Sequence, residues 1–281
     1  MNASFEDLYN KLNSSQKRAV DEIYGPVMVI AGPGTGKTQI LAARILNILQ
    51  KTDALPSNIL CLTYTEAGAA AMHQRLSQFM GSDAYKVNVH TFHGLCNRVI
   101  QENPQRFSKR ELRVMDDLER VQLIQDIIDE LPSDSPIKSY SENPVHLRRS
   151  LKQLWDIMQG EQLHPAQIES WVEALKDHET YKTAFPDEVY KRRSGNFMPG
   201  DLKLPKYETK HENWQRLIQA SQLFSRYQSL KQERGVYEFA DMIDWVVEAW
   251  AEGGDLLLDY KEQFHFVLVD EYQDTSGQQN Y

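Results

Sequence analysis

The sequence is poor in cysteine, with two among 281 residues, so a framework of disulfide bonds cannot hold the fold together. Cys61 and Cys96 are therefore expected to be free thiols in or near a core. Glycine (14) and proline (11) are too few for a collagen-like or disordered chain. No apolar run approaches the ~18 residues that a membrane-spanning helix needs. These absences predict a globular chain of about two domains, at ~150 residues per domain.

A secretory signal is also missing from the N-terminal residues, because they are polar and include Glu6 and Asp7. We therefore expect a cytoplasmic protein without a membrane partner. The net charge is −9, and residues 241–281, with ten acids and one base, account for all of it. The balanced remainder holds a basic cluster, Lys191-Arg192-Arg193, so the acidic sum does not exclude a nucleic-acid partner.

The first hundred residues alternate short β-branched runs with helical periodicity, the pattern of a parallel α/β sheet. A helix is predicted over Thr38–Leu49, where apolar residues recur on one side. The buried strands that apolar runs predict are Val27–Ala31, Ile59–Leu62, Val87–Val89 and Phe264–Val269.

Residues 107–234 differ from what precedes them, because they show helical periodicity, many prolines and a weak β signal. Trp155, Trp171 and Trp214 are expected to anchor the core of this region. The simplest architecture that accounts for these patterns is an α/β domain interrupted by a helical insertion.

A glycine-rich segment, Ala31-Gly32-Pro33-Gly34-Thr35-Gly36-Lys37-Thr38, follows the first predicted strand and opens a helix, the context of a phosphate-binding loop. Its backbone N–H groups and the helix N-terminus would face phosphates. Lys37 would neutralise the β and γ phosphates of a nucleotide, and the Thr38 hydroxyl would bind Mg²⁺. Ala31 departs from the usual glycine. The alternative is a turn without a ligand. The residues predicted to cradle the nucleotide are Gly32, Gly34, Thr35, Gly36, Lys37 and Thr38.

Two acids, Asp270 and Glu271, follow the last predicted strand. A nucleoside triphosphatase needs one carboxylate to hold Mg²⁺ and another to orient the attacking water, so Asp270 suits the first role and Glu271 the second. With Lys37 they form the predicted catalytic set. The alternative is an ordinary polar turn. Neighbouring strands of one parallel sheet would bring the loop and the acids together.

Several segments resemble, in the expected order, the motifs of superfamily 1 helicases of the UvrD/Rep/PcrA type over most of residues 12–281. The resemblance implies a P-loop, RecA-like motor domain that moves 3'-to-5' on single-stranded DNA and meets duplex junctions, driven by ATP and Mg²⁺. These segments are Leu12–Gln16 (Q motif), Thr63–Thr65 (motif Ia), Val89–Gly94 (motif Ib), Tyr237–Asp241 (re-entry into the first domain) and Asp270–Thr275 (motif II).

The same resemblance implies a division of the chain. Residues 1–106 and 235–281 would form the two parts of the RecA-like ATPase domain, and residues 107–234 a helical insertion of the 1B type. Motors of this kind bind ATP between two RecA-like domains. We therefore expect motif III and the second RecA-like domain to belong to a longer protein. The 281-residue chain alone is expected to bind MgATP without unwinding DNA, because the arginines of the second domain are missing from the site.

Each residue to which the resemblance assigns a ligand contact could instead have a purely structural role. Gln16 would contact adenine, yet Asn13 and Gln16 also have the spacing of a capping box for a helix over Ser14–Tyr24. Tyr64 would stack on a DNA base or pack in the core. The predicted DNA contacts are Tyr64, Thr65, Thr91 and His93, and a core position is the alternative for His93.

One departure from the family lies beside these contacts. Glu66-Ala67 stands where the family usually has Asn-Lys. An anion there would weaken the attraction of DNA phosphates, so Glu66 is not assigned a DNA contact. Thr63 and Glu66 also have the spacing of a helix cap.

Parts of the sequence are also compatible with other functions. His90, His93 and Cys96 have a zinc-like spacing, but a structural zinc site takes four ligands, so we predict no zinc. A P-loop kinase or GTPase is disfavoured because the sequence has no N-K-x-D guanine motif. The remaining alternative is a nucleotide-dependent DNA-binding or partner-docking module without helicase activity.

Overall fold

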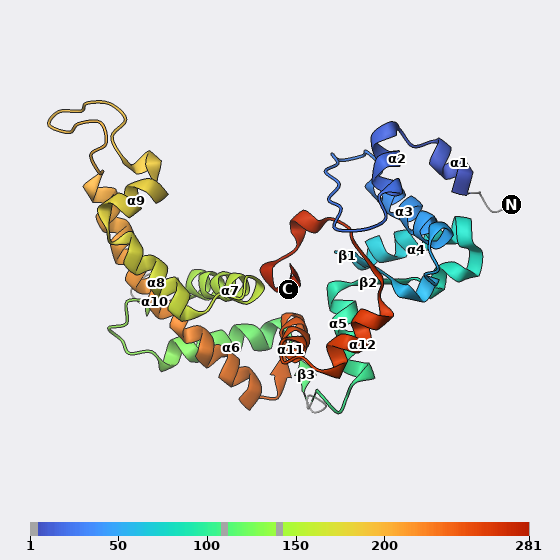
Figure 1. The fold of residues 1–281 in the computed structure, drawn as a ribbon. Coiled ribbons are helices and arrows are strands. Elements are labelled where there is room, and N and C mark those ends of the chain that lie inside the picture. The colour runs from blue at the N-terminus through green and yellow to red at the C-terminus, as the bar shows by residue number, and fades with distance from the viewer. Residues whose placement is uncertain (1–4, 108–111, 139–142, 281) are drawn as a thin grey trace. The chain divides into compact units, whose positions relative to one another are not determined.

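The structure is a computed structural model that describes residues 5–107, 112–138 and 143–280. The chain divides into two compact units, one of residues 1–110 and 241–281 and one of residues 111–240 (Figure 1). The fold is a mixed α/β fold with many helices and a small parallel sheet. Within the described ranges, no helix is both long and apolar enough to cross a bilayer.

The first unit contains the parallel sheet and the helices that pack on it. Its strands are β1 (Ile59–Thr63), β2 (Asn88–Thr91) and β5 (Phe266–Val269). Its α-helices are α1 (Phe5–Asn10), α2 (Ser14–Asp21), α3 (Lys37–Lys51), α4 (Glu66–Met80), α5 (Phe92–Glu102), α12 (Asp255–Gln263) and, from Asp241 onward, α11 (Phe239–Ala251). Short 3₁₀ helices are η1 (Pro56–Asn58), η2 (Gly81–Lys86), η5 (Tyr272–Asp274) and η6 (Gly277–Asn280).

The sheet has the order β2-β1-β5, and both strand pairs are parallel. Thr63 pairs with Thr91 in the register, and the Asp270 N–H donates to the carbonyl of Leu62 at 2.8 Å. The strands therefore end side by side, and the residues that follow them gather at one edge, where ligands bind in open α/β sheets.

Both cysteines are free and buried, as predicted. Cys61 lies in the middle of β1 and is fully buried, and Cys96 lies on the inner side of α5. Burial raises the pKa of each thiol to about 12. Both side chains therefore remain protonated and pack as small apolar groups.

One predicted strand is wrong. Val27–Ala31 forms neither helix nor strand, and the side chains of Met28 and Ile30 are 77% and 93% exposed. β5 pairs with β1, and residues 25–29 line a cavity together with Val267, Leu268 and Val269 of β5 rather than pairing with this strand. An apolar run becomes a strand only where a neighbouring strand accepts its backbone hydrogen bonds, and this segment has no such neighbour among the described residues.

The second unit is mostly helical. It contains α6 (Asp117–Glu130), α7 (Pro144–Gly160), α8 (Pro165–Leu175), α9 (His178–Ala184), η4 (Pro186–Glu188) and α10 (Leu204–Glu233). A two-residue parallel pair, β3 (Arg113–Val114) with β4 (Val236–Tyr237), joins its beginning to its end. The weak β signal of this region is thus confirmed.

Two of the three tryptophans predicted for this core are buried. Trp155 is 1% exposed, its ring packs at a tilt against that of Tyr227 with centroids 4.8 Å apart, and it donates to the carbonyl of Ala220 at 2.9 Å. Trp214 is 7% exposed. Trp171 is 53% exposed, because α8 buries the side that carries Ile168 and Val172. The prediction for Trp171 is therefore wrong.

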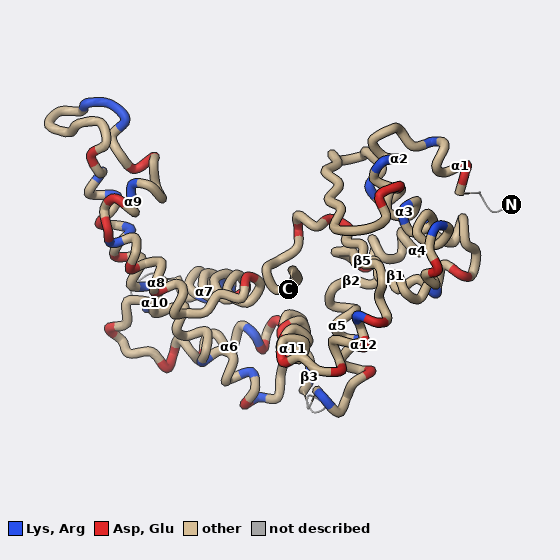
Figure 2. The backbone as a smooth tube through the Cα atoms, viewed as in Figure 1, with Lys and Arg blue, Asp and Glu red and all other residues tan. Residues whose placement is uncertain are grey.

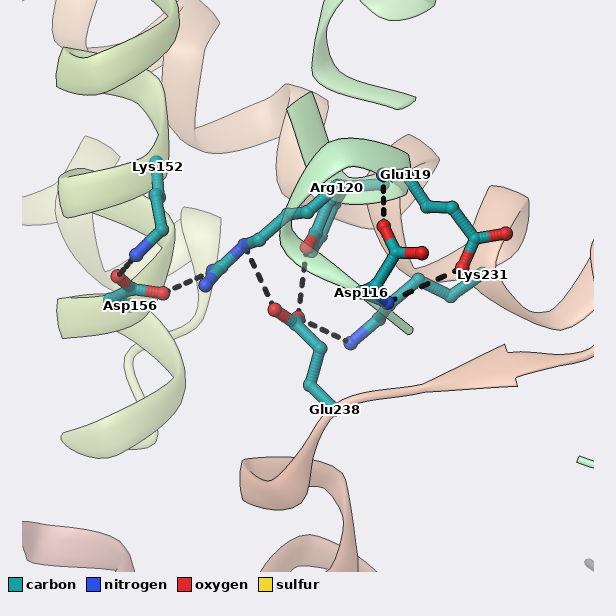
Figure 3. A network of polar contacts seen from close by, with 8 residues as sticks. Asp116, Glu119, Arg120, Lys152, Asp156, Lys231 and Glu238 are labelled. Carbon is teal, nitrogen blue, oxygen red and sulfur yellow. Dashed lines mark hydrogen bonds and ion pairs between the residues drawn. The ribbon is translucent and has the colours of Figure 1, made fainter. Parts of the chain in front are cut away.

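Charged side chains form a network around Glu238, directly after β4 (Figure 3). Its carboxylate lies 2.8 Å from Arg120 Nε and 3.2 Å from Lys231 Nζ, and it accepts a hydrogen bond from the Tyr227 hydroxyl at 2.8 Å. Arg120 also pairs with Asp156. Since these partners come from α6, α7 and α10, the network ties three helices to the end of the unit.

Glu238→Ala is expected to lower the free energy of unfolding by about 3 kcal/mol, because the Lys231 side chain is 2% exposed and its ammonium would lose a buried counter-ion. Asp187→Ala is the matched control. It removes the partner of Lys191 in a pair whose side chains are 71% and 85% exposed, and should leave the free energy of unfolding almost unchanged. Urea unfolding of both variants measures the difference, and equal losses would contradict the network's role.

Candidate nucleotide-binding site and the adjoining surface

A glycine turn directly precedes α3. Gly34 and Gly36 have φ angles of +72° and +84°, a region that side-chain-bearing residues rarely adopt. The Thr35 hydroxyl donates to the carbonyl of Gly32 at 2.7 Å and closes the turn. Gly36 is the N-cap of α3, and its carbonyl accepts from the N–H groups of Gln39 and Ile40. The glycines therefore turn the backbone directly before α3, and no strand precedes this turn in the described part of the chain from residue 5 onward. Its role as a phosphate-binding loop stays a prediction.

Lys37, the first residue of α3, meets the acids after β5. Its Nζ lies 2.8 Å from Glu271 Oε2, and the two side chains are 31% and 34% exposed. The hydrogen bond from Lys37 lowers the pKa of Glu271, and the same bond raises the pKa of Lys37. This contact joins residues 234 positions apart, so the loop and the acids lie together through Lys37 rather than through adjacent strands.

The two acids differ in environment. Desolvation and the neighbouring Glu271 charge raise the pKa of Asp270, whose carboxylate accepts from the Glu271 N–H at 3.0 Å. Glu271 has φ 51° and ψ 44°, a left-handed conformation that is uncommon for a residue with a side chain. Such strain is found at functional sites more often than elsewhere.

A cavity of about 480 Å³ adjoins these groups. Lys37, Asp270 and Glu271 line it, whereas the loop glycines and Thr38 do not. Thr38, the second residue of α3, is half-buried. The structure thus brings Lys37 and Glu271 into contact and Asp270 to the same cavity. The shared Mg²⁺ role of Thr38 and Asp270 stays a prediction.

Gln16 links α2 to the loop. The Asn13 side chain accepts from the Gln16 N–H at 2.9 Å, and the Gln16 side chain accepts from the Asn13 N–H at 2.8 Å, which confirms the capping box. The helix ends at Asp21, three residues earlier than predicted. Gln16 Nε2 also donates to the carbonyl of Thr35 at 3.0 Å. Gln16 therefore braces the glycine turn, and its adenine contact stays a prediction.

The four predicted DNA contacts lie where β1 and β2 end. Tyr64 is 55% exposed, so it does not pack in the core. Thr65 and Thr91 are the N-caps of α4 and α5, and each hydroxyl accepts from the N–H of a glycine three residues on at 3.0 Å. His93, in the first turn of α5, is half-buried, and burial lowers its pKa, so the ring is neutral near pH 7.

Sequence reasoning left out one residue of this surface. Glu66, the first residue of α4, accepts a hydrogen bond from the Thr91 hydroxyl at 2.8 Å. The N-cap of α4 is Thr65, so the spacing of Thr63 and Glu66 does not mark the cap. Knowledge of the β1–β2 register, which pairs Thr63 with Thr91, would have placed Glu66 beside Thr91.

A glycine turn that opens a helix, a lysine in its first turn and paired acids at a strand end are typical of proteins that bind nucleoside triphosphates. The sequence model of the family described as UvrD/REP helicase N-terminal domain matches residues 12–281. The chain belongs to this family.

Curated relatives carry helicase names. DNA helicase II of Rickettsia typhi is 26% identical over 274 residues, which cover 96% of this chain and 34% of the relative. The ATP-dependent DNA helicase PcrA of Staphylococcus epidermidis is 24% identical over 273 residues, which cover 97% of this chain and 31% of the relative. The chain thus spans about a third of the length of these relatives.

Proposed function

We propose that this chain is the ATP-binding part of a DNA helicase motor. The contact between Lys37 and Glu271, at 2.8 Å, carries the proposal, because it unites the phosphate loop with the acids of the predicted motif II. The relatives' names, DNA helicase II and ATP-dependent DNA helicase PcrA, support it. The first unit would be the RecA-like ATPase domain, and the second unit the helical insertion.

The residues of the glycine turn, of the start of α3 and of the neighbouring cavity fit MgATP in kind. The loop glycines leave backbone N–H groups for phosphate oxygens, Lys37 supplies a cation, and Thr38 and Asp270 supply the oxygen ligands that Mg²⁺ prefers. Bound Mg²⁺ would neutralise charge on the β and γ phosphates. A phosphate that pairs with Lys37 takes the place of the Glu271 carboxylate, which is then released to orient the attacking water.

Single-stranded DNA would lie across the surface of Tyr64, Thr65, Thr91 and His93. An exposed tyrosine ring offers a stacking platform for any base. This surface and the Asp270–Glu271 pair both follow strands of one sheet. ATP hydrolysis would drive movement with 3'-to-5' polarity in a longer protein, whereas the 281-residue chain would bind without unwinding.

Coupling between the two ligands tests the proposal. Fluorescence anisotropy of a labelled oligodeoxythymidylate should show that a non-hydrolysable ATP analogue with Mg²⁺ changes the chain's affinity for DNA by about fivefold or more. A P-loop kinase or GTPase would bind nucleotide without such coupling. A chain that binds neither ligand would contradict the proposal outright.

The loop between α9 and α10 is the part of the second unit that we propose to contact duplex DNA (Figure 2). Residues 189–200 include three bases and no acid. Ser194 and Phe197 exchange backbone hydrogen bonds at 3.0 Å, and the rings of Tyr190 and Phe197 stack with centroids 4.6 Å apart. This ordered turn presents Lys191-Arg192-Arg193 to solvent.

Reversing these three charges to glutamate should weaken duplex binding and make its logarithmic salt dependence shallower by up to ~3, at ~0.9 per phosphate contact. Reversal of Lys11, Lys51 and Lys86, which are exposed in the first unit, changes the net charge equally and serves as the control. If the variant with all three loop charges reversed keeps the wild-type affinity for duplex DNA and the wild-type salt dependence, the loop does not contact duplex DNA.

A further inference from the structure

The hydroxyl proton of Thr91 already has an acceptor. It accepts from the Gly94 N–H at 3.0 Å as the N-cap of α5, and its single proton is donated to Glu66 Oε1 at 2.8 Å. Thr91 is 6% exposed, whereas Glu66 is exposed. A second acceptor can take the Thr91 proton only if the Glu66 carboxylate moves away.

The Glu66 carboxylate lies against the beginning of both helices. Glu66 is the first residue of α4, so its own side chain is near the free N–H groups of that helix. A Cβ added at Gly94 would lie 3.9 Å from Glu66 Oε1, which places the carboxylate at the first turn of α5 as well. One anion thus lies where two helix dipoles favour negative charge.

We propose that Glu66 is an intramolecular competitor of the DNA phosphate and lowers the affinity of this chain for single-stranded DNA. The inference rests on the proposed function, because the surface of Tyr64, Thr65, Thr91 and His93 must meet DNA for the competition to matter. Binding of the strand requires the carboxylate to release Thr91 and to remain near the backbone as a like charge. Glu66 therefore limits the affinity of this surface for DNA.

Two substitutions separate charge from hydrogen bonding. Glu66→Gln keeps an oxygen that accepts from Thr91 and removes the charge alone, whereas Glu66→Ala removes both. Two unit charges ~4 Å apart in water repel with an energy worth about fivefold in affinity. Glu66→Gln should therefore tighten DNA binding about fivefold, and Glu66→Ala somewhat more, since it also frees the Thr91 hydroxyl.

The measurement is a titration of the 281-residue chain with a fluorescein-labelled oligodeoxythymidylate of about 16 nucleotides, over a range of salt concentrations. Both Glu66 variants should bind more tightly than wild type, with a steeper logarithmic salt dependence, by about 0.7 for one additional effective charge. Glu6→Gln, an exposed acid on α1, makes the same change in net charge and should leave the affinity unchanged. In a Thr91→Val background, Glu66→Ala and Glu66→Gln should give equal gains.

The outcomes are distinguishable. If wild type binds the oligonucleotide and the folded Glu66 variants bind equally or more weakly, Glu66 is a brace between the two helices and the inference is overturned. An equal gain from Glu6→Gln assigns the effect to net charge and also overturns it. If wild type does not bind DNA at any salt concentration, the proposed function fails, and this inference fails with it.

Discussion

Lys37→Ala is expected to weaken MgATP binding about a hundredfold or more. The substitution removes a charge-assisted contact to phosphate, worth about 1.5 to 3 kcal/mol. It also leaves Glu271, whose carboxylate lies 2.8 Å from Lys37 Nζ, as an uncompensated anion beside the phosphates. Both effects act in the same direction, so the loss should exceed that of an ordinary lysine contact.

Lys51→Ala is the matched control for Lys37. It lies at the other end of α3, and its ammonium is 54% exposed and 3.5 Å from Asp21. Titration with a fluorescent ATP analogue should give the wild-type dissociation constant for Lys51→Ala. Equal affinities of Lys37→Ala and wild type would place the nucleotide elsewhere.

Glu271→Gln should move binding and hydrolysis in opposite directions. The neutral amide no longer holds Lys37 as an ion pair, so MgATP should bind about two- to fivefold more tightly, which corresponds to the energy of a partly exposed ion pair. Hydrolysis should slow by about 10² to 10⁴, because the attacking water loses its general base. Equilibrium titration and a phosphate-release assay measure the two quantities separately.

Glu262→Gln, an exposed acid on α12, controls for the change in charge and should leave both quantities unchanged. A Glu271→Gln chain that binds less tightly than wild type would show that Glu271 holds Lys37 in its binding position rather than competing for it. A chain that hydrolyses ATP at the wild-type rate would remove Glu271 from catalysis.

Strands with neighbours were predictable from apolar runs alone. Ile59–Thr63 and Phe266–Val269 form where the runs predicted them, because each is next to another strand. Val27–Ala31 has an equally apolar sequence and remains unpaired and exposed. The composition of a segment indicates how much apolar surface it could bury. A strand forms only if a neighbouring segment also accepts its backbone hydrogen bonds, and the local sequence pattern does not identify that neighbour.

The candidate site shows the same limit. The residue types of the loop and of Asp270-Glu271 indicated their chemistry, but the direct bond between Lys37 and Glu271 depends on folding across 234 positions. Glu66 was set aside because its charge opposes DNA. Its bond to Thr91 depends on the register of β1 against β2, which only the folded sheet defines.

Glu271 and Glu66 have a common relation to the proposed ligands. Each carboxylate engages a group assigned to a phosphate, Lys37 in one case and Thr91 in the other. Both the nucleotide and the DNA would therefore bind by exchanging an internal carboxylate for a phosphate. Such exchange keeps the donors satisfied before binding and reduces the net gain when the ligand arrives.

The main proposal is that the loop and the acids after β5 form one MgATP site within this chain. Its most direct test is an equilibrium titration of the 281-residue chain with a fluorescent ATP analogue, with and without Mg²⁺. We expect saturable binding that weakens at least about tenfold when Mg²⁺ is withheld, because Thr38 and Asp270 then lose the ion they would share with the phosphates. Absence of saturable binding, or binding that is indifferent to Mg²⁺, would contradict it.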